Sequence, residues 1–169
     1  MTLIATAPDA ATFSPFGALI EKPDAAGDRR MFSHWLPPVE GLALQFHLNQ
    51  VAPSALPFAL SQVERHPHAA QAFVPVDVSR YLVTVMPSAA DGTPDVAGAR
   101  CFVLPGNVGV VYRRDVWHAG MTVLDRPGSF AVLMMRGAAD DDVMLSVPTM
   151  TIAPISSDIL RIASTGTDR

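Results

Sequence analysis

The feature that most constrains the fold is a succession of short apolar runs separated by prolines and glycines. The sequence of 169 residues contains 15 prolines and 11 glycines, which are spread along the chain rather than gathered in one linker. Many short strands between turn signals are typical of an all-β sandwich or barrel. The runs that we expect to form strands are residues 42–48, 58–64, 81–86, 101–104, 108–112, 121–124, 130–135 and 143–147.

Helical patterns are weak and lie near the two ends of the chain. A short helix is expected near residues 8–16, and a second at residues 157–163, where Ser157 is a suitable N-cap before a partial apolar stripe. The last residues, 164–169, have the composition of a frayed tail. We therefore predict one all-β domain over residues 1–163, with short flanking helices.

The composition argues against several classes of protein. Hydrophobic residues make up 49% of the chain and charged residues 17%, which is unlike a disordered protein. The formal net charge is -4, and the basic residues form no stripe, so a general nucleic-acid binder is not expected. The single cysteine, Cys101, allows no intrachain disulfide and lies in an apolar run, where a free cysteine is usually buried.

The sequence also predicts no membrane partner. No apolar stretch approaches the roughly 18 residues that a membrane-spanning helix requires. The N-terminus lacks the positively charged region of a signal peptide and reaches Asp9 early. We expect a soluble protein of the cytoplasm.

Two motifs carry most of the candidate chemistry. Glu64, His66 and His68 are two residues apart, so an extended strand would point all three side chains to one face. An acid and two imidazoles on one face cost desolvation free energy unless they meet water, a metal or each other. Gln71 follows closely, and the distant Trp117-His118 offers another imidazole beside a large aromatic ring.

These residue types suit a metal site, but the spacing alone leaves a simpler interpretation open. Imidazoles, carboxylates and amide oxygens all bind divalent metals, which makes His66, His68, Gln71 and His118 candidate ligands inside a barrel. Glu64 is then the best candidate for a general base or a further ligand. The alternative is that residues 66–68 form a polar surface turn and that Glu64 pairs with a surface cation.

The same motifs resemble those of the cupin superfamily. In that superfamily a His-x-His motif on one strand and a single later histidine hold a metal in the barrel, and His66, His68 and His118 would fill those places. The glutamate that usually follows the second histidine is missing here, and Gln71 is the nearest polar residue.

The resemblance narrows to the ureidoglycolate lyases. Glu64-Arg65-His66-Pro67, followed by Gln71-Ala72-Phe73-Val74-Pro75, is similar to the hallmark segment of that family. Further matches continue in order through most of residues 40–148: Pro94-Asp95, Arg100, Phe102, Gly109-Val110, Tyr112, Arg114 and Val116-Trp117-His118. The resemblance implies a cupin-like double-stranded β-helix (jelly-roll) barrel, assembled as a homodimer.

The resemblance also implies an activity. Members of this family are carbon–nitrogen lyases of purine (allantoin) degradation that split ureidoglycolate, a small anion, into glyoxylate and urea. The candidate cofactor is a divalent metal ion, namely nickel, manganese or zinc. The reaction needs a base for the hydroxyl proton, an acid for the departing nitrogen, and a cation or N–H donors for the carboxylate.

These requirements assign roles to the candidate residues. We expect Glu64, His66, Tyr112 and His118 to be catalytic, and Gln71, Arg114 and Trp117 to bind substrate. Three of these residues also have a plainer interpretation: Tyr112 as a half-buried barrel residue, Arg114 as part of a solvated turn, and Trp117 as a packing residue. A run of acids at residues 140–142 is interpreted as a solvated loop.

Four positions depart from the family pattern. Gln50 stands where an arginine is expected, Val111 replaces an asparagine, Ala119 a histidine, and Met135 an aspartate. His47 is in turn an unusual imidazole. If these four residues line the pocket, they change its polarity, and two alternatives to ureidoglycolate cleavage arise. The protein is then a metal-dependent cupin acting on another small hydroxy, amino or oxo acid, or a non-catalytic paralogue that binds a small molecule.

Overall fold

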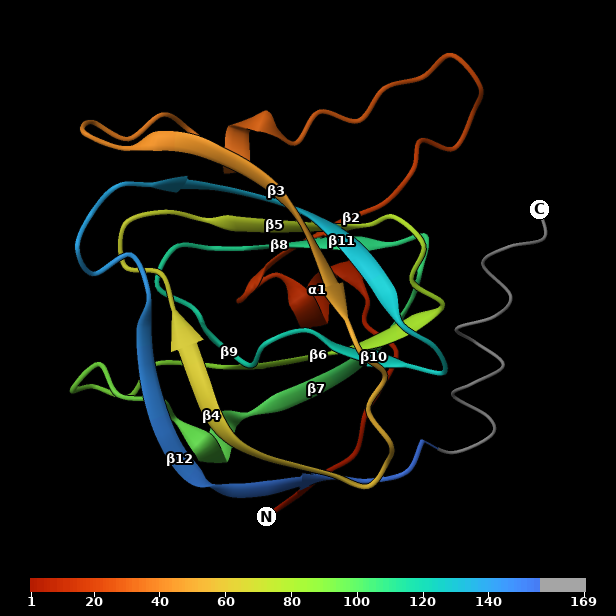
Figure 1. Cartoon of the computed structure of the whole chain (residues 1–169), viewed down its shortest axis with the longest axis vertical. Coiled ribbons are helices and arrows are strands. Elements are labelled where there is room, and N and C mark those ends of the chain that lie inside the picture. Colours follow the sequence, from red (N-terminus) through yellow and green to blue (C-terminus); the bar gives the residue numbers. More distant parts are fainter. Residues whose placement is uncertain (156–169) are drawn as a thin grey trace.

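The computed structural model describes residues 1–155, so the helix predicted at 157–163 and the tail at 164–169 lie outside the described residues. Two sheets form the molecule (Figure 1). The seven-stranded sheet has the order β1-β12-β4-β9-β6-β10, with β7 also paired to β6. Its strands are β1 Thr2–Leu3, β4 Phe58–Arg65, β6 Arg80–Met86, β7 Arg100–Pro105, β9 Trp117–His118, β10 Thr122–Leu124 and β12 Val143–Ile152.

The second sheet has five strands in the order β2-β8-β5-β11-β3. In Figure 1 it crosses the upper part of the molecule, above the seven-stranded sheet. Its strands are β2 Gly17–Ile20, β3 Ala43–Val51, β5 Gln71–Pro75, β8 Gly109–Tyr112 and β11 Gly128–Arg136. Neighbouring strands are antiparallel throughout, except that β1 runs parallel to β12.

The sheets enclose a shared apolar core. Phe73 and Phe130 of the five-stranded sheet pack with Val83 and Val85 of the other sheet, and all four are buried. Alternation along each strand places such residues on the inward face. The curled, closed arrangement confirms the predicted all-β, cupin-like barrel.

Helical structure is limited to one turn and two short 3-10 segments within residues 1–155. Helix α1 covers Ala10–Phe13, shorter than the predicted 8–16, and the 3-10 segments are η1 Ser33–Trp35 and η2 Val96–Gly98. Asp9 caps α1 by accepting a hydrogen bond from the Thr12 backbone N–H. Pro15 has no N–H to continue the helix. Phe13 inserts into the shared core.

All eight predicted strands are present, and four strands were not predicted. β1, β2 and β9 are each four residues or shorter, which leaves too little sequence for an alternating pattern. β5 begins with a polar residue, Gln71, and ends with Pro75, which has no N–H to donate, so its sequence is not typical of a strand. Cys101 is buried as expected, and burial raises the pKa of its thiol to about 11.

Within the part of the chain that the structure describes, none of the helices is long and apolar enough to cross a bilayer.

Two isoleucines test the core. Ile152 is 1% exposed and Ile4 is 67% exposed. We expect Ile152→Ala to lower the free energy of unfolding by about 2–5 kcal/mol, because it leaves a cavity. Ile4→Ala is the matched control and should change it by less than about 0.5 kcal/mol. Chemical denaturation at one protein concentration measures both, and equal effects would contradict the placement of Ile152 in the core.

Candidate active site

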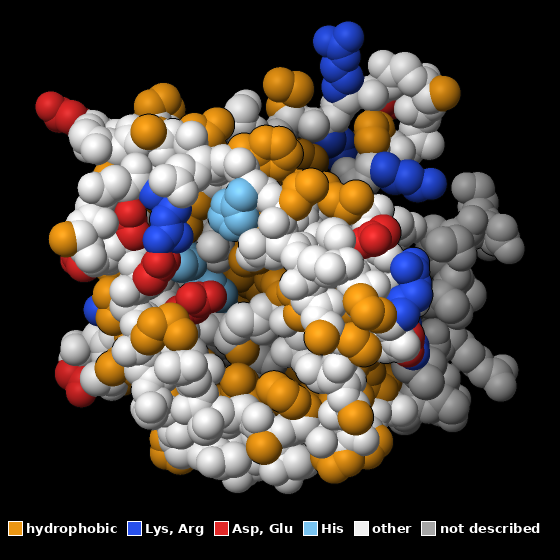
Figure 2. Space-filling view, in the orientation of Figure 1, with side chains coloured by type: hydrophobic (Ala, Val, Ile, Leu, Met, Phe, Trp, Pro, Cys, Tyr) orange, Lys and Arg blue, Asp and Glu red, His pale blue; other side chains and the backbone are white. Residues whose placement is uncertain are grey.

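A cavity of about 360 Å³ opens between the two sheets and collects the polar residues of the barrel interior. Strands β3, β5 and β11 line one side and β4 with the start of β12 the other. Figure 2 shows this face hollowed, with histidine side chains beside acidic and basic ones in the hollow. The polar and ionisable residues that line its wall are Glu64, His66, Gln71, Arg136, Asp142, His47 and Asn49.

Glu64 and His66 of this wall form a central group with His118, which is buried and does not itself line the cavity. One ligand atom from each lies within 4.8 Å of the other two. The short strand β9 pairs with β4 so that His118 stands directly opposite Glu64. The rings of His66 and His118 are tilted at a centroid distance of 5.1 Å. A carboxylate and two imidazoles from two segments far apart in the sequence, residues 64–66 and strand β9, thus meet at one place.

Backbone carbonyls fix the tautomers of both histidines. His118 Nδ1 donates to the Val116 carbonyl oxygen at 2.9 Å. His66 Nδ1 lies 3.0 Å from the Asp141 carbonyl oxygen and 3.0 Å from Asp142 Oδ1. Since these oxygens only accept, each Nδ1 carries the hydrogen, and the Nε2 of a neutral ring carries a lone pair.

Both Nε2 atoms belong to the central group. His118 Nε2 is buried and 3.5 Å from Glu64 Oε1, and it makes no hydrogen bond within residues 1–155. His66 Nε2 lies 3.0 Å from Gln71 Oε1. A neutral imidazole and an amide oxygen both accept, so the neutral state requires the Gln71 amide to rotate and present its nitrogen.

The charge states of this group follow from its neighbours. The His118 imidazole beside Glu64 holds the pKa of that carboxyl below its ordinary value, although burial opposes the shift. Burial lowers the pKa of His66, assisted by the nearby His118, so the neutral ring is favoured. The Arg136 guanidinium, which forms a fork with Asp142, lowers the pKa of the Asp142 carboxyl.

Tyr112 supports His118 from behind. The two rings stack at a centroid distance of 4.3 Å. The phenol oxygen is buried and without a hydrogen-bond partner in the described part of the chain. Burial raises the pKa of this phenol well above its ordinary value, so the hydroxyl keeps its proton.

The structure does not bring every sequence-predicted residue to this group. The expectation that one strand presents Glu64, His66 and His68 is wrong, because β4 ends at Arg65. The chain bends after it, and His68 Nε2 meets Asp140 Oδ1 at 2.7 Å on the surface instead. The regular alternation of a strand therefore does not extend to His68.

Arg114 and Trp117 also lie elsewhere. Arg114 is exposed and lines two other cavities. Trp117 is fully buried in the core of the seven-stranded sheet, donates from Nε1 to the Gly92 carbonyl oxygen, and lies under the Arg65 guanidinium. Its role in the structure is packing beneath β9.

Sequence reasoning missed Arg136 and Asp142. Residues 140–142 are more than the solvated loop we expected: Asp141 is buried, and its carbonyl oxygen, like the Asp142 carboxylate, contacts His66. Arg136 stands on the inward-facing register of β11, with Met134 and Val132. That alternation was visible in the sequence, but the cavity it faces was not.

The four departures from the family pattern lie outside the cavity wall. On β3, His47 and Asn49 line the cavity, so Gln50 has the opposite parity and faces away. Ala119 belongs to the core of the seven-stranded sheet. Val111 is buried, and Met135 packs in a separate small cluster. These substitutions therefore do not change the residues that a substrate in this cavity would meet.

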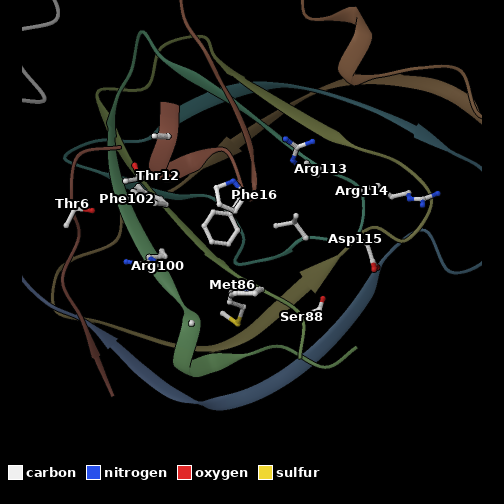
Figure 3. A pocket seen from close by; sticks show the side chains of 15 residues that line it. Thr6, Thr12, Phe16, Met86, Ser88, Arg100, Phe102, Arg113, Arg114 and Asp115 are labelled. Atoms are coloured by element: carbon white, nitrogen blue, oxygen red, sulfur yellow. The ribbon is translucent and has the colours of Figure 1, made fainter. Parts of the chain in front are cut away.

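A larger cavity of about 730 Å³ lies beside α1 and holds no comparable group. Arg100, Arg113 and Arg114 stand around it, but Figure 3 shows them spread along the rim rather than converging. Arg113 is held by the Ser14 carbonyl oxygen and stacks on Trp35. The candidate acid–base residues of the barrel therefore lie at the smaller cavity.

Fold and cavity together define a cupin-like barrel with an acid–base group in its interior. The family model for ureidoglycolate lyase matches residues 1–152. The chain belongs to the ureidoglycolate lyase family, which is a family of enzymes.

Two relatives from Salmonella agree with this assignment. The chain is 32% identical over 153 residues to the ureidoglycolate lyase of Salmonella typhimurium, covering 83% of this chain and 91% of that protein. It is 31% identical over 157 residues to the ureidoglycolate lyase of Salmonella enteritidis. Among solved structures, a dTDP sugar isomerase from Desulfovibrio desulfuricans is similar with a TM-score of 0.48 and 16% identity, over 90% of this chain and 91% of that one.

The lowered pKa of His66 predicts a pH effect on stability. Between about pH 7.5 and 5.5 the unfolded chain protonates this histidine near its ordinary pKa of about 6.5, whereas the folded ring resists protonation. The stabilisation present above that pKa is thus lost as the pH falls. We expect His66→Gln, in chelator-treated protein, to lose less free energy of unfolding over this interval than the wild type does. Parallel pH profiles from chemical denaturation would contradict this.

Proposed function

We propose that the protein is a ureidoglycolate lyase, a carbon–nitrogen lyase of the cytoplasm that releases glyoxylate and urea. The observation that carries the proposal is the Glu64–His66–His118 group, two members of which line the barrel cavity, in a chain from this family. The alternatives, another small acid as substrate or a non-catalytic binder, are not favoured. They depended on changes at Gln50, Val111, Ala119 and Met135, which do not line the cavity.

The group has the properties that the reaction requires. Cleavage breaks the hydroxyl O–H and the C–N bond, and it forms the aldehyde C=O and a new N–H on urea. One proton therefore moves from oxygen to nitrogen, and a single base can remove it and return it. Glu64 is ionised because its pKa is lowered, and His118 Nε2 stands 3.5 Å away to share the proton.

The remaining residues hold this pair in place. The Val116 carbonyl oxygen fixes the His118 tautomer, and Tyr112 stacks on its ring. Gln71 lies beside His66 and presents an amide toward the cavity. We assign Tyr112 to positioning, and Gln71 and His66 to binding of the substrate oxygens.

The same donors fit a divalent metal ion. Two imidazole Nε2 atoms with available lone pairs and one carboxylate are a common ligand set, and the orphaned His118 Nε2 is consistent with it. The cavity wall also holds two carboxylates, Glu64 and Asp142, against one guanidinium, Arg136, and the substrate is itself an anion. A bound metal would act as a Lewis acid for the substrate oxygens. We propose Glu64, His66 and His118 as its ligands; with the metal bound, one Glu64 oxygen would coordinate it and the other would remain to take the hydroxyl proton.

Activity tests the proposed base. We expect the purified protein to release urea and glyoxylate from ureidoglycolate, and Glu64→Gln to lower kcat by about 10²–10⁴-fold through loss of the base. Glu40→Gln, at an exposed glutamate outside the cavity, is the matched control and should keep wild-type kcat. A wild type that forms no urea, with or without added metal, would overturn the proposed activity.

Metal content tests the proposed ligands separately. Purified protein incubated with Mn²⁺, Ni²⁺ or Zn²⁺ and desalted should retain about one ion per chain by elemental analysis, and the ion should raise the melting temperature by mass action. His118→Ala should abolish both effects, whereas His34→Ala, at an exposed histidine outside the cavity, should not. Equal retention by the two variants would exclude this ligand set.

We further propose that the enzyme is a homodimer that pairs through the outer face of strands β3 and β11. Leu44, Phe46 and Leu48 of β3 point outward and are 57%, 66% and 64% exposed. Their β11 neighbours on that face are Met135, Leu133 and Ala131. No charged residue interrupts this outward row, and a contiguous exposed apolar patch is typical of an interface.

A charge placed in this patch should break the dimer. We expect the wild type to elute as a dimer and Phe46→Glu as a folded monomer in size-exclusion chromatography with light scattering. The reason is that each copy of the variant would bury an unpaired carboxylate in the interface. Ile4→Glu, equally exposed but distant on the sequence and on the other sheet's edge, should remain dimeric. A monomeric wild type would refute the dimer.

A further inference from the structure

Arg136 and His47 occupy the same cavity wall, and the acid–base mechanism uses neither of them. Both lie on the inward register of the five-stranded sheet. His47 of β3 pairs with Val132 of β11, and Arg136 lies four residues further along β11. At about 3.4 Å per residue this separates the two levels by roughly 14 Å along the strands. The Arg136 guanidinium nevertheless reaches toward the central group, because it binds Asp142, whose Oδ1 lies 3.0 Å from His66 Nδ1.

Gln71 lies between these two levels. It pairs with Met134 of β11, which is two residues from Arg136 and two from Val132. Gln71 contacts His66, so the central group sits near the middle level of the wall. A substrate whose reacting carbon lies at that group would therefore extend one end toward Arg136 and the other toward His47.

We infer that Arg136 binds the carboxylate of the substrate and that His47 binds its ureido group, so that the two residues together set specificity. This inference rests on the proposed function. It names the residues that recognise the two halves of the molecule that the reaction separates.

Arg136 is suited to the carboxylate end. Among the residues that line this cavity it is the only arginine or lysine. Its guanidinium is oriented by the fork with Asp142, and Asp142 Oδ1 also lies 3.0 Å from His66 Nδ1. The fork occupies two of the five N–H groups, and Arg136 Nε lies 3.9 Å from Asp141 Oδ2, so the guanidinium keeps donors for a further carboxylate.

His47 is suited to the ureido end. Its side chain is exposed on the cavity side of β3, and it makes no hydrogen bond or ion pair within residues 1–155. A ureido group offers one carbonyl acceptor and several N–H donors, and a neutral imidazole supplies one donor and one acceptor to match. Asn49, the next residue on the same face, adds an amide beside it.

Two small molecules that the enzyme does not cleave test the carboxylate end and the ureido end of the substrate separately. Glyoxylate carries the carboxylate without the ureido group, and N-carbamoylglycine carries both but lacks the hydroxyl that the reaction needs. Their dissociation constants are measured by calorimetry on the wild type, Arg136→Gln and His47→Ala. The matched controls are Arg100→Gln and His34→Ala, at exposed residues outside this cavity. Thermal melts verify that each variant is folded.

We expect Arg136→Gln to raise the dissociation constants of both probes by about 10–100-fold, because it removes charge-assisted hydrogen bonds to the carboxylate. His47→Ala should weaken N-carbamoylglycine by about tenfold, raise KM for ureidoglycolate by a similar factor with little change in kcat, and leave glyoxylate binding unchanged. The controls should bind both probes as the wild type does.

Three results would overturn the inference. The first is that His47→Ala and Arg136→Gln weaken the binding of glyoxylate equally, and the second is that Arg136→Gln leaves glyoxylate binding unchanged. The third is a wild type that binds neither probe at millimolar concentration. Binding of the probes requires no turnover. If the wild type binds them with the expected pattern but forms no urea, the proposed function fails while the assignment of the two ends stands.

Discussion

The pairing of β9 with β4 is the contact on which the site depends. β9 contributes only Trp117 and His118, yet this pairing sets His118 opposite Glu64 and buries Trp117 beneath it. A buried imidazole next to a carboxylate is stable only if both are satisfied or share charge. The Val116 carbonyl oxygen satisfies one side of the ring, and the other side is left for chemistry.

The two sheets supply different residues to the site. The seven-stranded sheet carries Glu64 and His118, and the start of β12 follows Asp142, which bonds to His66. The five-stranded sheet supplies Gln71, His47 and Arg136 from its inward face. The proposed reacting groups and the proposed recognition groups thus face each other across the cavity.

Strand β3 has a second role because it is an edge strand. Its inward residues line the cavity, and its outward residues, Leu44, Phe46 and Leu48, form the exposed apolar row. An uncovered apolar edge is unfavourable in water and invites pairing. Covering the row with a second copy would hold β3 against the cavity and limit the motion of His47.

The sequence by itself determined the barrel, eight of the twelve strands within residues 1–155, the family and the choice of Glu64, His66 and His118 as candidate site residues, because these depend on local periodicity and short motifs. It could not exclude His68, since alternation assumes that the strand continues, and β4 ends at Arg65. It also could not find Arg136 or Asp142, or show that Gln50, Val111, Ala119 and Met135 avoid the cavity. Only the tertiary structure decided these points, because they depend on how strands distant in the sequence pair, and one residue of register moves a side chain to the other face.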